Sequence, residues 1–197
     1  KEITLDTGVI ARNRTLKKFS GDEWLSEPLK GWGEILEDDL GVTAIDISAT
    51  EDASINVDGS VIEVKDLYTN QTVTSHDDKV DARIISPNKT WVHGKIIDAK
   101  TRETLAARIH FRSSEGRYFP PYGHTHEVND NWFEDYGADL LLGDTQYAYI
   151  DGTFQGELPV GDVYVEVSKG FEYLPVRKKL TISPGQKNLE IELTRSS

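Results

Sequence analysis

Apolar and polar residues alternate in several short segments after about residue 40, among them 42–49, 71–74 and 80–85. Because successive side chains of a strand point to opposite faces, this period of two is typical of strands with one buried face. The last of these segments ends at the turn-forming pair Ser86-Pro87. The pattern therefore predicts a β-rich region up to about residue 90.

The clearest turn signal in this region is the pair Asp58-Gly59, which lies between two strand-like segments, 53–57 and 60–65. These two residue types readily adopt the positive φ angles of a tight type I′ turn. The sequence therefore predicts a β-hairpin whose turn is Asp58-Gly59.

Residues 1–40 are less regular, and one stretch, 25–39, has the apolar spacing of a short helix. Four apolar residues would share one face of that helix: Trp32, Ile35, Leu36 and Leu40. Glycines within the stretch and Pro28 oppose regular helical structure. We therefore predict a helix of one or two turns at most.

A second series of strand-like segments begins at residue 91, and turn-forming pairs such as Asp151-Gly152 separate them. Seven segments belong to the series: 91–98, 105–112, 146–150, 153–158, 162–167, 176–182 and 189–193. Short strands at this spacing are typical of an antiparallel β-sandwich. The sequence therefore predicts an all-β fold.

These patterns divide the chain into an N-terminal β-rich region, 1–90, and a β-sandwich, 91–197. Within the sandwich, the insert 113–145 is too long for an ordinary connection between two strands. The pattern leaves open whether 1–90 forms a second sandwich of its own or adds strands to the first. Long ordered loops often carry function, so we look for candidate sites in the insert.

Composition narrows the classes of function. The formal net charge is −12, and no local basic cluster offsets it, which opposes binding to nucleic acid. No apolar run reaches the roughly 20 residues that cross a bilayer, so a membrane partner is not expected either. Cysteine is absent, which excludes disulfides, thiolate zinc sites and cysteine nucleophiles. Methionine is absent too, and we expect the chain to begin within a longer product.

Three stretches follow one another in a characteristic order: Gly94-Lys-Ile-Ile-Asp-Ala-Lys-Thr-Arg-Glu-Thr-Leu, Asp151-Gly-Thr-Phe-Gln-Gly-Glu-Leu-Pro-Val-Gly and Val163-Tyr-Val-Glu-Val. In this order they make residues 91–195 resemble the transthyretin-like, or carboxypeptidase-regulatory-like, β-sandwich family. That family usually has a glycine in the first turn, where this chain has Arg102. The resemblance implies the same sandwich fold for 91–195.

Two further runs, Lys169-Gly-Phe-Glu-Tyr-Leu-Pro-Val and Pro120-Pro-Tyr-Gly-His-Thr-His-Glu-Val-Asn, are similar to a region of metallohydrolases related to carbaryl hydrolase. In those enzymes the region precedes a metal domain of the polymerase-and-histidinol-phosphatase (PHP) type. That domain opens with Gly-Asp-x-His-x-His, a motif this chain lacks. The resemblance implies a non-catalytic accessory module of a larger secreted or periplasmic hydrolase. Its partner would be the downstream catalytic domain of the same polypeptide, and no catalytic residue is carried over.

The insert holds the candidate metal ligands. In His124-Thr-His126 both imidazoles lie on one face of an extended segment. With a carboxylate from Glu127 or Asp130 they would suit zinc with an open position for water. The acids of the insert, Asp130 among them, would instead suit calcium. A structural role, in which these side chains bond the insert to the sandwich, is the alternative that we favour, because the histidine pair lacks a defined third ligand.

The same insert holds the candidate carbohydrate-binding residues. Aromatic side chains stack on the apolar faces of sugar rings, while amide groups bind the hydroxyl groups. Such a site would use five aromatic and two amide side chains: Tyr118, Tyr122, Trp132, Phe133, Tyr136, Asn129 and Asn131. The alternative is that the aromatic residues pack against the edge of the sandwich and anchor the insert.

Catalysis by the chain alone is the third hypothesis. Acidic pairs such as Glu127 with Glu134 would suit a glycosidase, and tyrosine with histidine would suit a polysaccharide lyase. No nucleophile elbow, phosphate loop or His-Glu-x-x-His motif occurs. We therefore predict that the chain is not an enzyme. An accessory module comes first, a carbohydrate-binding module second, and a small metal-dependent or lyase-type enzyme acting on polysaccharide third.

Overall fold

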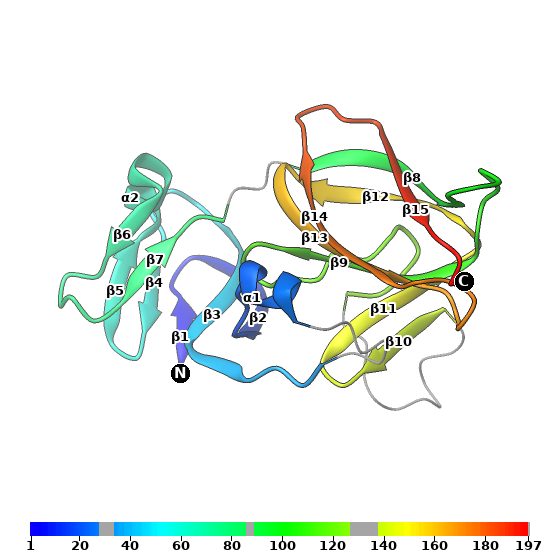
Figure 1. Ribbon diagram of the computed structural model, residues 1–197. Coiled ribbons are helices and arrows are strands. Elements are labelled where there is room, and N and C mark those ends of the chain that lie inside the picture. The colour runs from blue at the N-terminus through cyan, green and yellow to red at the C-terminus, as the bar shows by residue number, and fades with distance from the viewer. Residues whose placement is uncertain (28–33, 86–88, 127–137, 197) are drawn as a thin grey trace. The chain divides into compact units, whose positions relative to one another are not determined.

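The computed structural model describes residues 1–27, 34–85, 89–126 and 138–196 (Figure 1). These residues are mostly strands, which confirms the predicted all-β class. They form two compact units: Lys1–Leu16 with Asp39–Pro87, and Lys17–Asp38 with Asn88–Ser197. The units differ from the predicted division at residue 90 in one respect, because residues 17–38 belong with the sandwich.

The strands before residue 86 pair in three groups. One antiparallel sheet contains β1 (Ile3–Leu5), β4 (Ser54–Val57) and β5 (Ser60–Glu63). The other two groups are pairs: β2 (Gly8–Lys17) with β3 (Asp38–Ala49), and β6 (Thr72–Thr74) with β7 (Asp81–Arg83). The strands predicted at 42–49, 71–74 and 80–85 correspond to β3, β6 and β7, whereas the sequence pattern does not indicate β1 and β2.

The predicted β-hairpin is confirmed. Asp58 and Gly59 connect β4 to β5 with φ angles of 50° and 94°, as a type I′ turn requires. The returning strand is shorter than predicted because the chain turns into α2 (Val64–Asn70), which buries Val64 and Leu67 one helical turn apart. Five buried residues form the core of this unit: Ala53, Ile55, Ile62, Val64 and Leu67.

The second unit is a sandwich of two β-sheets (Figure 1). The larger sheet is antiparallel and has, in order, β10 (Asp139–Leu142), β11 (Thr145–Ile150), β9 (Ala107–Ser113), β13 (Gly161–Ser168) and β14 (Val176–Ile182). The smaller sheet has β12 (Thr153–Pro159), β8 (Lys89–Asp98) and β15 (Asn188–Leu193), with β15 parallel to β8. All seven strands predicted from residue 91 onward are present, and β10 is an additional strand within the insert.

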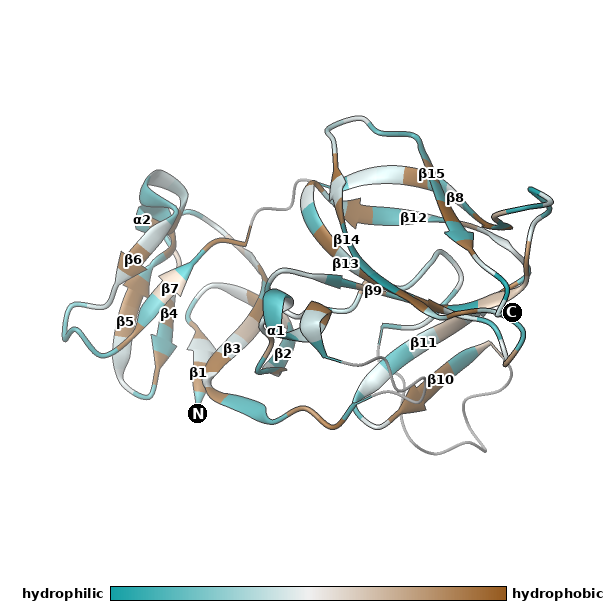
Figure 2. Cartoon of the chain, in the orientation of Figure 1, coloured by the Kyte–Doolittle hydropathy of each residue, from teal (hydrophilic) through white to brown (hydrophobic). Residues whose placement is uncertain are grey.

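The alternation of residues along the strands places the core between the two sheets. Along β8, Val92 and Ile96 are fully buried. His93 and Lys95, which lie between them in the sequence, are exposed. Hydrophobic and hydrophilic residues also follow one another along several other strands of the sandwich (Figure 2). Buried residues of both sheets meet in this core: Val92, Ile96, Ile109, Phe111, Leu158, Val163, Val165, Val167, Ile191 and Leu193. Full burial of one such side chain stabilises a fold by about 1.5–3 kcal/mol.

Residues 17–27 cover part of the outer face of the larger sheet. Trp24, in α1 (Gly21–Ser26), is 6% exposed. Its ring lies edge-on to Tyr164 of β13, with the ring centroids 6.0 Å apart. Phe19 packs on the same tyrosine, with a centroid distance of 5.2 Å. Three aromatic rings therefore hold the segment on the sheet.

The helix predicted within 25–39 is wrong in position, because α1 ends at Ser26. Ile35 and Leu40 are 88% and 79% exposed and cover no core. Trp32 lies outside the described residues. Burial of Trp24 against the larger sheet, rather than the apolar spacing further along the chain, selects the helical turn. No helix in the described parts of the chain has the length and apolar character that crossing a bilayer needs.

The insert begins at the end of β9, and its last described part is β10, which pairs with β11. Near its start, Phe119 is 6% exposed and belongs to the core between the sheets. The Phe119 N–H donates to the carbonyl of Phe111 at 2.9 Å. One aromatic residue thus anchors the insert to the sandwich.

Candidate functional site

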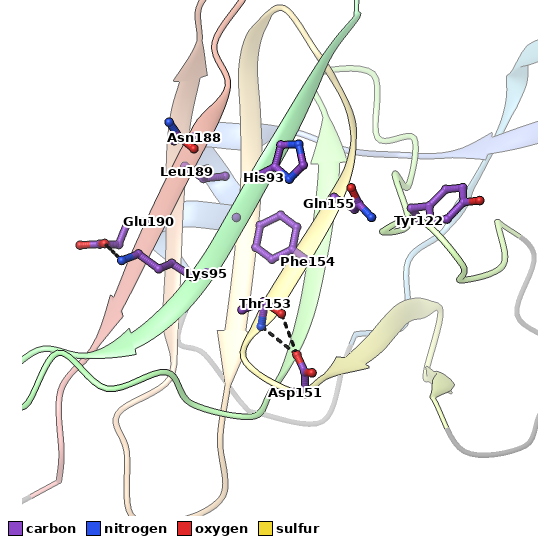
Figure 3. A pocket seen from close by; sticks show the side chains of 11 residues that line it. His93, Lys95, Tyr122, Asp151, Thr153, Phe154, Gln155, Asn188, Leu189 and Glu190 are labelled. Carbon is purple, nitrogen blue, oxygen red and sulfur yellow. Dashed lines mark hydrogen bonds and ion pairs between the residues drawn. The ribbon is translucent and has the colours of Figure 1, made fainter.

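A groove of about 920 Å³ lies on the outer face of the smaller sheet (Figure 3). This face carries the exposed side chains of β12, β8 and β15, whereas their inward-facing side chains fill the core. Seven polar side chains of the sheet and its turns line the groove: His93, Lys95, Asp151, Thr153, Gln155, Asn188 and Glu190. The volume lies within the range of small-molecule sites, roughly 300–1,000 Å³.

Strand register arranges six of these side chains in two rows across the sheet. In the first row, His93 of β8 lies between Gln155 of β12 and Asn188 of β15. The second row is centred on Lys95, with a threonine and a glutamate from the same two neighbouring strands. The rows are about 6.8 Å apart, because an antiparallel strand rises about 3.4 Å per residue. Amide, imidazole and hydroxyl groups on adjacent strands can both donate and accept hydrogen bonds.

Two exposed aromatic side chains stand at one end of the rows. Trp91 is 41% exposed and Tyr122 is 71% exposed, and their ring centroids are 5.7 Å apart at an interplanar angle of 62°. Trp91 precedes His93 by two residues on β8 and therefore faces the same way. Tyr122 belongs to the insert, and its N–H donates to the carbonyl of Gln155 at 2.7 Å. This hydrogen bond holds the tyrosine beside β12 at the rim of the groove.

Hydrogen bonds keep the two acids of the groove ionised. The Lys95 ammonium, 2.9 Å from Glu190, lowers the pKa of that carboxyl from its ordinary value. The backbone N–H and the hydroxyl of Thr153 both donate to Asp151 at 3.0 Å and lower its pKa as well. Neither acid is therefore disposed to carry a proton near neutral pH.

The two described members of the predicted carbohydrate site lie on different faces of the sandwich. Tyr122 lines the groove, but Tyr118 is half-buried beside the larger sheet, with its hydroxyl inaccessible. The Tyr118 ring stacks on His110 with a centroid distance of 5.1 Å, and burial raises the pKa of its phenol. The other predicted members lie outside the described residues: Asn129, Asn131, Trp132, Phe133 and Tyr136.

Of the predicted metal ligands, His124 and His126 are described, and Glu127 and Asp130 lie outside the described residues. The Nδ1 atom of His124 is 2.9 Å from a carboxylate oxygen of Asp139. Such a contact orients metal-ligating histidines, and it would equally tie the insert to β10. Within the described ranges, no three histidine or acidic side chains gather as a metal-binding set. The zinc or calcium site therefore stays a prediction.

A second polar cluster lies on the outer face of the larger sheet, where it is buried. The Tyr147 hydroxyl donates to Glu166 at 2.8 Å, and Arg177 donates to the other carboxylate oxygen of Glu166 at 3.0 Å. Arg177 also donates to Glu34 and to the carbonyl of Trp24, each at 2.9 Å. The side chains of Glu166 and Arg177 are 2% and 6% exposed. These groups bond one another and the N-terminal segment that covers them, while the buried Nε atom of Arg177 has no hydrogen-bond partner among the described residues.

His110 is fully buried in the same cluster. Its Nδ1 atom is 2.6 Å from the carbonyl of Gln146 and must carry the proton, because a carbonyl only accepts. The pKa of His110 is well below its usual value, mainly because the ring is buried and to a smaller extent because of the charge of Arg112. Burial also lowers the pKa of Arg112 to about 10. The low dielectric of this site therefore opposes any further positive charge.

Sequence reasoning directs attention to the insert and misses most of the groove. The groove does have a signal in the sequence of β8, because Trp91, His93 and Lys95 alternate there with core residues. That alternation appears equally in β9, where the outward residues are buried. A pattern of period two thus identifies outward positions without showing which outward face is left uncovered.

No family model matches the chain, and no curated protein matches it. The β-sandwich is therefore a finding of the structure, and the transthyretin-like and hydrolase-related resemblances remain predictions.

Three solved structures show weak similarity. The group B streptococcus pilus 2b backbone protein is 17% identical with a TM-score of 0.37, and the match covers 74% of this chain and 50% of that one. The shaft pilin SpaA from Lactobacillus rhamnosus GG is 11% identical with a TM-score of 0.36, covering 99% and 92% of the two chains. The phospholipase PlaB from Legionella pneumophila is 10% identical with a TM-score of 0.27, covering 68% and 31%. The chain thus spans half the length of the pilus backbone protein, and likenesses this weak carry no argument about function.

Proposed function

We propose that the chain is a non-catalytic module that binds carbohydrate in the groove on the outer face of the smaller sheet. The exposed pair Trp91 and Tyr122, standing beside two rows of polar side chains, carries the proposal. Aromatic rings suit the apolar face of a sugar ring, and amide and hydroxyl groups suit its hydroxyl groups. In this arrangement the insert contributes Tyr122, and the sheet contributes the other binding groups.

The acids of the groove support binding rather than hydrolysis. A glycosidase needs a carboxylic acid with a raised pKa to protonate the leaving oxygen. In the groove, hydrogen bonds lower the pKa of Asp151 and of Glu190 instead. Both would be poor proton donors near neutral pH.

A binding module fits the accessory role that the resemblance of 91–195 implies. In that role the sandwich holds a secreted or periplasmic hydrolase on its polysaccharide, while the catalytic domain lies elsewhere in the same polypeptide. The open reading frame beyond Ser197 tests this part of the proposal. We expect a Gly-Asp-x-His-x-His motif there, and a continuation without any enzyme domain would contradict the accessory role.

Sedimentation with insoluble polysaccharides tests carbohydrate binding directly. We expect the wild-type protein to sediment with at least one polysaccharide of a panel of cellulose, mannan, xylan and starch. Trp91→Ala and Tyr122→Ala should each weaken that binding about tenfold, the equivalent of one lost stacking contact. Tyr149→Ala is the matched control, because Tyr149 is 48% exposed but belongs to β11 of the larger sheet. Binding that survives both groove variants would contradict the proposed site.

A further inference from the structure

We infer that the groove selects uncharged polysaccharide chains and rejects acidic ones, such as those that contain uronic acids. This inference rests on the proposed function and adds the class of sugar to it. The inference depends on the ion pairs and the net charge of the side chains in and beside the groove.

Three cations in and beside the groove have carboxylate partners. Lys95 is the one lysine or arginine among the lining residues, and it is 2.9 Å from Glu190. On the same strand, the Lys89 ammonium is 3.6 Å from Glu157 of β12. Arg102, in the turn after β8, contacts two carboxylates of β15, one of which is Glu190. An acidic sugar would have to displace one of these carboxylates before it gained an ion pair with Lys95, Lys89 or Arg102.

The fixed charge of the groove is negative. Asp151 and Glu190 line it against the single ammonium of Lys95, and both carboxyls have lowered pKa values. The whole chain carries a formal charge of −12. Repulsion would therefore slow the approach of an acidic polysaccharide, most strongly at low ionic strength. A neutral chain meets no such barrier and leaves the ion pairs intact.

Uncharged hydroxyl groups match the remaining lining groups. The amides of Gln155 and Asn188 each offer donors and an acceptor, and the imidazole of His93 lies between them. Trp91 and Tyr122 offer ring surfaces at the end of the row. These groups can bind a sugar without any charge on the ligand.

The face formed by the groove and by Trp91 beside it is longer than one sugar ring. Trp91 and Lys95 are four residues apart on β8, which corresponds to roughly 14 Å along an antiparallel strand. Aromatic rings stand at the Trp91 end, and the polar rows extend away from them. We therefore expect the affinity for a neutral oligosaccharide to rise as units are added from one to three.

Affinity electrophoresis with the full chain tests the selection. Native gels would contain a neutral polysaccharide (galactomannan, β-glucan or dextran) or an acidic one (polygalacturonate or alginate). We expect a neutral polysaccharide to retard the wild-type protein and the acidic ones to leave its mobility unchanged. Trp91→Ala should lose about tenfold in affinity for the neutral chain. Glu190→Gln, which frees Lys95, should gain up to about fivefold in affinity for the acidic chains, the equivalent of one exposed ion pair.

The outcomes separate this inference from the proposed function. Retardation by an acidic polysaccharide that Trp91→Ala abolishes would overturn the selection of neutral chains and leave carbohydrate binding in the groove intact. Mobility unchanged in every gel would overturn the proposed function itself. Retardation by a neutral chain that Trp91→Ala leaves unchanged, with Tyr149→Ala as the control, would place the sugar elsewhere and overturn both.

Discussion

The two outer faces of the sandwich carry polar side chains in the same alternating pattern, but their surroundings differ. On β8 the outward side chains of His93 and Lys95 are exposed. On β9 the outward His110 and Arg112 are 1% and 3% exposed. The difference arises because residues 17–27, Glu34 and the start of the insert cover the larger sheet, whereas the smaller sheet keeps an open groove.

The segments that cover the larger sheet, here called the cover, change what the same residue types do. Beneath it, Tyr147, Glu166 and Arg177 bond one another in a low dielectric, where removal of one partner leaves another group unsatisfied. In the groove, the ion pair of Lys95 with Glu190 is half exposed, and such pairs contribute at most about 1 kcal/mol to stability. The comparison therefore assigns stability to the covered face, and the open face is where we propose that a ligand binds.

The largest effect should come from Glu166→Ala on the covered face. The substitution leaves the buried guanidinium of Arg177 without one partner, and we expect a loss of about 3–5 kcal/mol in the free energy of unfolding. Urea denaturation followed by circular dichroism measures it. Glu190→Ala is the matched control on the open face and should lose no more than about 1 kcal/mol. Similar losses for the two variants would break the comparison.

The next effect, a difference of about 2 kcal/mol in the free energy of unfolding at pH 5, should come from His110. Its lowered pKa keeps it neutral in the folded state, while in the unfolded state it takes up a proton below about pH 6.5. The wild-type protein thus loses stability through this group as the pH falls below 6.5. His110→Gln should show a smaller decline between pH 7 and pH 5, by about 2 kcal/mol. A decline of His110→Gln identical to that of the wild type would refute the assignment.

A smaller effect should come from Tyr147→Phe, which removes the hydroxyl that donates to Glu166. We expect a loss of about 1.5–2 kcal/mol, because the acceptor is a buried carboxylate. Thermal and urea denaturation would both report it. The same substitution at Tyr149, which is 48% exposed on the same strand, should change stability by less than about 0.5 kcal/mol. A loss at position 149 as large as that at 147 would contradict the role given to the cover.

The smallest effect on stability should come from the groove. Gln155→Ala changes an exposed side chain, and we expect a change within about 0.5 kcal/mol. Its affinity for a neutral polysaccharide should nevertheless fall severalfold, since a hydrogen bond to the sugar is lost. Measuring both quantities on one preparation sharpens the comparison. A variant that lost stability but bound sugar normally would show that the open face is structural.

Local patterns predicted most strands because alternation and turn chemistry act over a few residues. Asp58-Gly59 forms the expected turn, and each strand predicted from residue 91 onward is present. The pattern misses β10, whose Asp139–Leu142 segment does not alternate and becomes a strand by pairing with β11. It misplaces the N-terminal helix because Trp24 finds its partner Tyr164 far along the chain.

The candidate site was predictable only in part. The insert contributes Tyr122, which belongs to the predicted set, while Tyr118 from the same set stacks on His110. The two tyrosines are four positions apart, and the sequence does not distinguish them. Their different positions depend on Phe119, which lies between them in the sequence and is buried in the core. At Phe119 the chain passes from the outer face of the larger sheet to β12 of the smaller sheet.

By itself the sequence determined the all-β class, the strand positions in the sandwich and the inward or outward direction of their side chains, because these follow from short-range periodicity. Only the tertiary structure decided which outward face is covered, because covering depends on long-range packing by residues 17–27 and by the start of the insert. That packing buries His110 and leaves His93 open to a ligand. Burial sets the dielectric around each group, and so it separates a stabilising cluster from a binding groove built of similar residues.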